Sequence, residues 1–162
     1  MRKTGRFLTA AAALMGSTLL TAAPAEAAPY WQTVSTNLSW KCAPTAAHPA
    51  KAGVGYQACL VRNAYDDAQV VLVVVNNSSS AVTISGTVTS SFGPDASCSA
   101  YNLAVGERRG CFGTTGPIAE CLYGAGFPDP GEQNYGGTVR LTVNGVGKSM
   151  DSPTTECVEP PA

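Results

Sequence analysis

The chain has six residues whose side chains can form disulfides or bind a metal: Cys42, Cys59, Cys98, Cys111, Cys121 and Cys157. Zinc ligands usually include close pairs such as Cys-x-x-Cys, and no two of these cysteines are that close. We therefore expect no metal site. An even number of cysteines in an exported chain instead predicts three disulfides. Six cysteines allow 15 connectivities, and because each successive pair flanks one plausible turn or loop we expect the pairs 42–59, 98–111 and 121–157.

The only histidine, His48, is poorly placed for catalysis. It lies between Pro44 and Pro49 in a segment typical of a loop, and no G-x-S-x-G motif presents a serine to it. We expect a solvated loop histidine. Glu107 and Glu120 could act as a glycosidase pair, but the sequence offers few aromatic residues to line a cleft. We therefore expect no enzymatic activity and no cofactor.

Two candidate binding residues, Arg108 and Arg109, lie close to Cys111. On a protruding loop held rigid by a disulfide, one of these arginines would suit a trypsin-like protease, and the chain would be a secreted protease inhibitor. Alternatively, the arginines solvate the edge of a strand and discourage association between sheets. Gly106 and Gly110 suit a tight turn into a strand, so the second interpretation is favoured.

Aromatic residues gather before the first cysteine, where Trp31 and Trp40 follow Tyr30. Exposed rings there would offer a flat platform for the faces of sugars. The alternative is that the tryptophans pack at one end of the core. We favour core packing and keep Trp31 and Trp40 as candidate binding residues.

The N-terminus has a basic stretch, an apolar stretch and a small-x-small motif: Arg2, Lys3 and Arg6, then Phe7 to Leu20, then Ala25-Glu26-Ala27. This order is typical of a secretory signal peptide. The apolar stretch is shorter than the roughly 20 residues that a membrane span needs. We therefore expect a signal peptide over residues 1–27, cleavage after Ala27, no remaining membrane anchor, and one secreted domain over residues 28–162.

The charges of the chain exclude some partners. The whole sequence has ten Lys and Arg against eleven Asp and Glu, and the basic residues beyond the N-terminal segment are scattered. A protein that binds nucleic acid would need clustered Lys and Arg. We expect no nucleic-acid partner, and an extracellular protein or glycan instead.

The elements that must position these residues are short strands. Apolar runs or alternating patterns predict strands at 56–62, 69–75, 82–89, 97–103, 108–112, 121–123 and 139–143. The run at 69–75 is too apolar for a strand with one solvent-exposed face, which indicates a central strand. Asn144-Gly145 predicts a turn into a final strand. We therefore expect an all-β fold, an antiparallel sandwich of about seven short strands stabilised by disulfides.

Two stretches carry a resemblance to known families. Val70 to Val88, followed by Leu103-Ala104-Val105-Gly106-Glu107, resembles the strand, turn, strand and "L-x-x-G-E" pattern of bacterial immunoglobulin-like modules. With the Ala-rich leader, the whole chain resembles small secreted actinobacterial proteins of unknown function. The resemblance implies an immunoglobulin-like sandwich with a non-catalytic binding or structural role outside the cell. The Cys…Trp…Cys order of antibody domains is absent, because both tryptophans precede the first cysteine.

Overall fold

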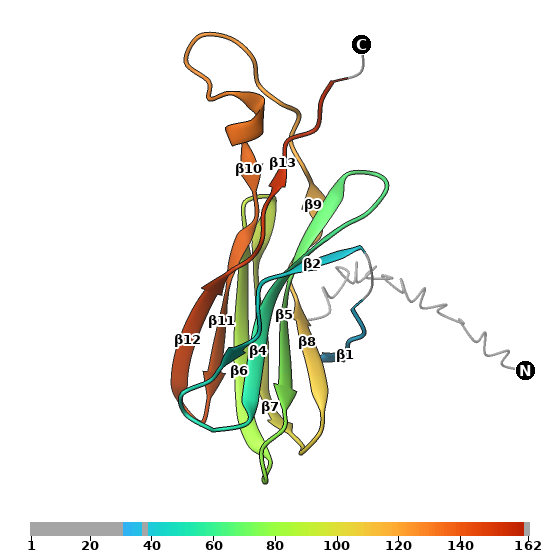
Figure 1. Cartoon of the computed structure of the whole chain (residues 1–162). Coiled ribbons are helices and arrows are strands. Elements are labelled where there is room, and N and C mark those ends of the chain that lie inside the picture. Colours follow the sequence, from blue (N-terminus) through green and yellow to red (C-terminus); the bar gives the residue numbers. More distant parts are fainter. Residues whose placement is uncertain (1–30, 37–38, 161–162) are drawn as a thin grey trace, which may run out of the picture.

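The computed structural model describes residues 31–36 and 39–160 (Figure 1). The predicted signal peptide, residues 1–27, lies outside the described residues, as does Tyr30. The described chain forms two antiparallel sheets packed face to face, a third sheet of two short strands, and one short 3-10 helix. The predicted all-β antiparallel sandwich is confirmed.

The larger sheet is built around the most apolar strand of the chain. It has the order β1 (Gln32–Thr33), β8 (Arg108–Phe112), β5 (Asp67–Asn76), β4 (Val54–Arg62) and β2 (Trp40–Cys42), with β3 (Ala46–Ala47) paired to β4 and β9 (Gly116–Pro117) paired to β5. Strand β5 contains the predicted central strand 69–75, and β4 and β8 flank it on either side. That prediction is therefore confirmed.

The smaller sheet has four strands in the order β12 (Val146–Asp151), β11 (Gly137–Val143), β6 (Val82–Ser90) and β7 (Gly93–Leu103). Asn144 and Gly145 join β11 to β12 with φ angles of 48° and 85°. Positive φ at both central residues is what a tight type I′ hairpin requires, and Asn-Gly adopts it readily. The predicted last turn and final strand are confirmed.

The main core lies between the two sheets. Val82, Ile84 and Val88 of β6 point into it, while the threonines that alternate with them face outward. The disulfide Cys98–Cys111 crosses this core, because it joins β7 of the smaller sheet to β8 of the larger one.

A second apolar cluster covers the outer face of the larger sheet. Val71 and Val73 of β5 point to this face and are 0% and 2% exposed, packed with Val34 and half-buried Trp40 from the N-terminal segment. Strand β5 is therefore buried on both faces, which explains why its sequence is continuously apolar rather than alternating.

The three disulfides pair as predicted: Cys42–Cys59, Cys98–Cys111 and Cys121–Cys157. Three disulfides in one chain indicate an oxidising environment. The strand predicted at 121–123 is wrong, since these residues lie in a loop. The backbone N–H and C=O of Leu122 form hydrogen bonds with the side-chain amide of Gln133. In a strand, these two groups would bond to the backbone of a neighbouring strand instead.

Candidate binding surface

One end of the molecule extends beyond the sandwich as a long loop (Figure 1). The loop leaves the larger sheet after β9, passes through the 3-10 helix η1 (Pro130–Glu132), and returns as β10 (Asn134–Tyr135), which pairs with β13 (Thr155–Glu156). We call residues 120–133 and 155–160 together the tip.

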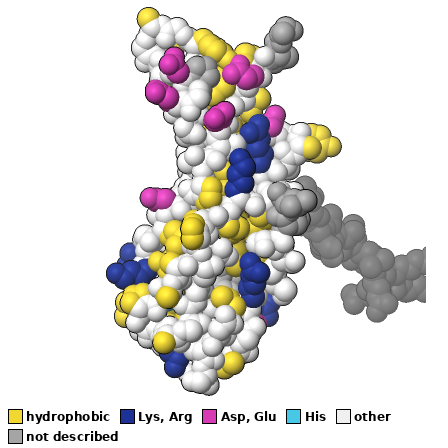
Figure 2. All heavy atoms as spheres, in the orientation of Figure 1, with side chains coloured by type: hydrophobic (Ala, Val, Ile, Leu, Met, Phe, Trp, Pro, Cys, Tyr) yellow, Lys and Arg dark blue, Asp and Glu magenta, His cyan; other side chains and the backbone are white. Residues whose placement is uncertain are grey.

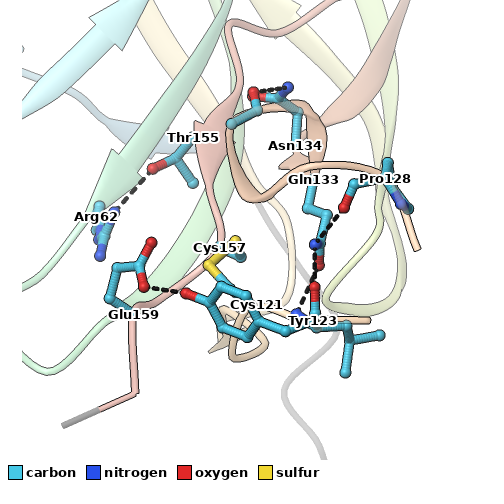
Figure 3. Close-up of a disulfide and its surroundings, with 11 residues drawn as sticks. Arg62, Cys121, Tyr123, Pro128, Gln133, Asn134, Thr155, Cys157 and Glu159 are labelled. Carbon is cyan, nitrogen blue, oxygen red and sulfur yellow. Dashed lines mark hydrogen bonds between the residues drawn. A yellow bond between two sulfur atoms is a disulfide. The ribbon is translucent and has the colours of Figure 1, made fainter. Parts of the chain in front are cut away.

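The tip is fastened at its base by covalent and backbone bonds. Figure 3 shows the disulfide Cys121–Cys157, which ties the loop to the C-terminal segment. Next to it, the backbone N–H of Cys121 donates to the C=O of Val158 at 2.9 Å, and the N–H of Val158 donates to the C=O of Ala119 at 3.0 Å. The loop is therefore held at a fixed position beside the C-terminal segment.

Gln133 holds the interior of the loop. Its side chain is buried, with 9% exposed, and its Oε1 accepts a hydrogen bond from the backbone N–H of Leu122 at 2.9 Å. Its Nε2 donates to the C=O of Leu122 at 2.7 Å and to the C=O of Pro128 at 3.0 Å (Figure 3). Both polar ends of the amide are therefore satisfied within the loop.

Three large apolar side chains project from the loop that Gln133 holds. Leu122, Tyr123 and Phe127 are 50%, 54% and 51% exposed. Between them, Gly124 and Gly126 have φ angles of 114° and 99°, a conformation that other residues rarely adopt, so the tight course of the loop depends on glycine. Apolar side chains gathered on a surface are typical of interaction sites.

The charge of the tip is entirely negative. Its charged side chains are all carboxylates, and all are exposed: Glu120, Asp129, Glu132, Glu156 and Glu159. The phenol of Tyr123 donates a hydrogen bond to the carboxylate of Glu159 (Figure 3), and this bond raises the pKa of Tyr123. The Tyr123 hydroxyl is therefore protonated at neutral pH.

Arg109 lies in β8, where it pairs with Thr33 of β1 and Val74 of β5 and is not on a protruding loop. Its guanidinium pairs with the carboxylate of Glu107, with Nε to Oε1 at 2.7 Å, and donates to the hydroxyl of Thr33 at 2.7 Å. The phenol of Tyr101 also donates to Glu107 at 2.7 Å, and this bond contributes most to lowering the pKa of the Glu107 carboxyl. The network joins β8 to the N-terminal strand β1, and the guanidinium of Arg109 is held by both Glu107 and Thr33.

Arg108 faces a shallow pocket on the outer face of the larger sheet. The pocket has a volume of about 170 Å³ and is also lined by Val73, Val75, Gly55 and Gln57. Ligand pockets usually have volumes of about 300 Å³ or more. This pocket is therefore too small for most ligands.

The structure places Trp31 and Trp40 on opposite faces of the larger sheet. Trp31 is 7% exposed in the main core, where its Nε1 donates to the C=O of Ser99 at 2.9 Å. A Cβ atom at Gly86 would come within 3.1 Å of its ring and 2.8 Å of Leu72 Cδ2, so a larger residue there would have to displace these side chains. Trp40 belongs to the outer cluster and makes an edge contact with Phe112. The two rings do not form a shared platform.

The expectation that His48 is solvated is wrong. His48 is 2% exposed, its ring packs edge-on against Tyr56, and its Nε2 has no hydrogen-bond partner. Burial is the main cause that lowers its pKa, and the positive charge of Lys148 adds to the shift, while the backbone of Leu141 opposes it. His48 is therefore a neutral residue of the interior.

The projecting residues of the tip, Leu122, Tyr123 and Phe127, were absent from the candidates identified by sequence. One signal could have indicated them: three large apolar residues interrupted by glycines, between a cysteine and Pro128, in a segment without strand or helix periodicity. Such residues are exposed unless a distant segment covers them.

Comparison of the chain with protein-family models, with curated proteins and with solved structures found no match. Within residues 31–36 and 39–160, no helix is long and apolar enough to span a membrane. The same residues contain no group of three His, Cys, Asp or Glu side chains arranged to hold a metal ion.

Proposed function

We propose that this chain is a secreted, non-catalytic binding protein and that the tip is its binding surface. The observation that carries the proposal is the exposure of Leu122, Tyr123 and Phe127 on one fastened loop. Aromatic residues are enriched in protein interfaces, and clusters of exposed apolar side chains mark interaction sites.

The fastening of the tip supports the same proposal. A loop that must be ordered on binding loses conformational entropy, and this loss weakens affinity. The disulfide Cys121–Cys157 and the three hydrogen bonds of Gln133 order the loop before any partner arrives. The sandwich then acts as the rigid body that carries the tip.

The protease-inhibitor alternative finds less support. It requires an arginine on a protruding loop, whereas Arg108 and Arg109 both lie in β8 and pair with Val75 and Val74 of β5. Arg109 is also bound to Glu107 and Thr33. We therefore do not favour an inhibitor based on these arginines.

We also propose that residues 1–27 are a signal peptide and that residues 28–162 form one extracellular domain. The order of basic, apolar and small residues in the leader supports export, and the three disulfides fit it. The resemblance to immunoglobulin-like modules and to small actinobacterial secreted proteins rests on the sequence pattern and fits a binding role.

A capture experiment tests the binding role of the tip. The protein, a Leu122→Ser/Tyr123→Ser/Phe127→Ser variant and a control variant are immobilised and exposed to the culture fluid of the producing cells. The control is Val105→Ser/Val146→Ser, which alters side chains on the sandwich that are 56% and 45% exposed. Bound proteins and glycans are quantified by mass spectrometry.

We expect one partner that the protein and the control variant retain at least about tenfold better than the tip variant, because aromatic side chains at the centre of an interface contribute most to affinity. Reconstitution of that partner with the purified protein should give a complex of fixed stoichiometry. Equal recovery of the same molecules by all three forms would contradict the proposal.

A further inference from the structure

We infer that the partner of the tip is a basic protein, which places arginine side chains beside an apolar residue on the tip surface. The inference rests on the proposed function, since it names the class of partner for the same surface. It comes from the distribution of charge between the tip and the sandwich.

Charge is segregated along the molecule. All seven Lys and Arg of the described residues belong to the sandwich and its N-terminal segment, and none belongs to the tip, which has five carboxylates. Figure 2 shows most of the visible Asp and Glu side chains over the upper part of this face, next to hydrophobic side chains, with one group of Lys and Arg directly below them and the others lower down. A partner that approaches the tip therefore meets a negative field.

No carboxylate of the tip forms an ion pair within the described part of the chain, although two cations lie at its base: Arg62 donates to the hydroxyl of Thr155 at 2.9 Å, and Lys41 lines the same pocket as Arg62 and Glu156. The two ion pairs of the described residues are Arg62–Asp66 and Arg109–Glu107, and both lie in the sandwich. The acidic and the apolar groups of the tip also lie close together in sequence, since one residue separates Glu120 from Leu122 and one separates Phe127 from Asp129. A partner with both positive and apolar groups matches this arrangement.

This chemistry separates the possible partner classes. Nucleic acids and anionic membranes carry negative charge, so five carboxylates would repel them. A neutral glycan would stack on Tyr123 and Phe127 but would gain nothing from the charge. An arginine side chain gains from both features, because its guanidinium stacks on aromatic faces and bonds carboxylates through two N–H groups.

A random-peptide phage library provides a defined probe. The library is selected on the immobilised protein, and the enriched peptides are sequenced and synthesised. Their affinities are measured by fluorescence polarisation. We expect enrichment of peptides that combine Arg with an apolar residue, and an affinity that falls at least about tenfold for the Leu122→Ser/Tyr123→Ser/Phe127→Ser variant.

A second variant tests the charge alone. Glu120→Gln/Asp129→Asn/Glu132→Gln keeps the apolar side chains and removes three carboxylates, and Asp95→Asn in β7 is the control on the sandwich. We expect the first variant, and not the control, to lower the affinity about tenfold. For the unmodified protein, affinity should fall steadily as NaCl rises from about 50 to about 500 mM, because salt screens exposed charges.

The two proposals fail in different ways. Peptides that depend on Leu122, Tyr123 and Phe127 but show no preference for Arg or Lys, or that bind the charge variant equally well, would overturn the basic partner and leave the tip as a binding surface. Peptides that bind the apolar tip variant as well as the unmodified protein, or no enrichment at all, would overturn both.

Discussion

Replacing Gln133 by alanine should loosen the tip without unfolding the sandwich. The change deletes three hydrogen bonds, which join the Gln133 side chain to the N–H and C=O of Leu122 and to the C=O of Pro128. The backbone C=O of Gln133 also accepts a hydrogen bond from the N–H of Cys157, beside the disulfide. The variant keeps this backbone bond. The effect is therefore confined to the interior of the loop.

The magnitude follows from the number of bonds lost. A hydrogen bond contributes about 0.5–1.5 kcal/mol net, so three contribute roughly 2–4 kcal/mol. Leu122 and Pro128 are exposed, so water replaces part of the lost bonding and the lower value of about 2 kcal/mol applies. Because about 1.4 kcal/mol corresponds to a factor of ten, the loop should open about 30 times more often.

Native-state hydrogen exchange measures this opening directly. In Gln133→Ala the amide of Leu122 should exchange at least about 30 times faster, since the loop opens more often and the acceptor of this amide is also gone, while the amides of β5 keep their rates. Gln69→Ala is the matched control, because it removes one side-chain hydrogen bond in the sandwich, from Nε2 to the C=O of Gly113 at 2.7 Å. This control should leave Leu122 unchanged.

An unchanged rate at Leu122 in Gln133→Ala would refute the assignment of Gln133 as the residue that holds the loop. An equal acceleration in β5 would show that the tip and the sandwich open together, which would contradict the separation of a fastened tip from its rigid support.

Three further predictions concern the whole domain. Cys98→Ser/Cys111→Ser removes the disulfide between the two sheets, which closes a loop with a sequence separation of 13. The change should lower the free energy of unfolding by about 3 kcal/mol and the Tm by roughly 10 °C in a thermal scan. A Tm within about 2 °C of the unmodified protein would contradict this. Burial lowers the pKa of His48 in the folded state, so folding favours the neutral imidazole. The contribution of neutral His48 to the free energy of unfolding is therefore complete above the ordinary pKa of about 6.5, and it is lost as the pH falls through the lowered value. Urea unfolding should therefore show a loss of stability with acidification that His48→Phe reduces, and parallel pH profiles would disprove it. Protein from culture fluid should begin at or near Ala28 and contain no free thiol, so an intact mass equal to that of the precursor would argue against export with cleavage.

The strands were predictable because their pattern is local. Val82, Ile84 and Val88 alternate with threonines, and this period of two fixes which side faces the core. The continuous apolar run of β5 indicated burial on both faces, but it did not indicate what covers the second face. Val34 and Trp40 do so from a distant part of the chain, through contacts without a local signal.

The surroundings of His48 and Leu122 depend on contacts with other segments of the chain. His48 is buried because β3 pairs with β4, which brings its ring against Tyr56. Leu122 has a strand-like sequence, but its backbone bonds to the side chain of Gln133 instead of to a strand. Propensity and periodicity describe residues within one element, so neither could predict these partners, which lie in another strand or beyond a turn.

Mapping by nuclear magnetic resonance shows which surface of the protein a ligand contacts, and so it tests whether the tip is the binding surface. A ¹⁵N-labelled sample of the protein is titrated with the tightest Arg-containing peptide from the phage selection. Chemical-shift changes are expected at residues 120–133 and 155–159, with the amides of β6 and β11 unchanged. Changes centred instead on the outer face of the larger sheet, around Arg108 and Val73, would show that the tip is not the binding surface.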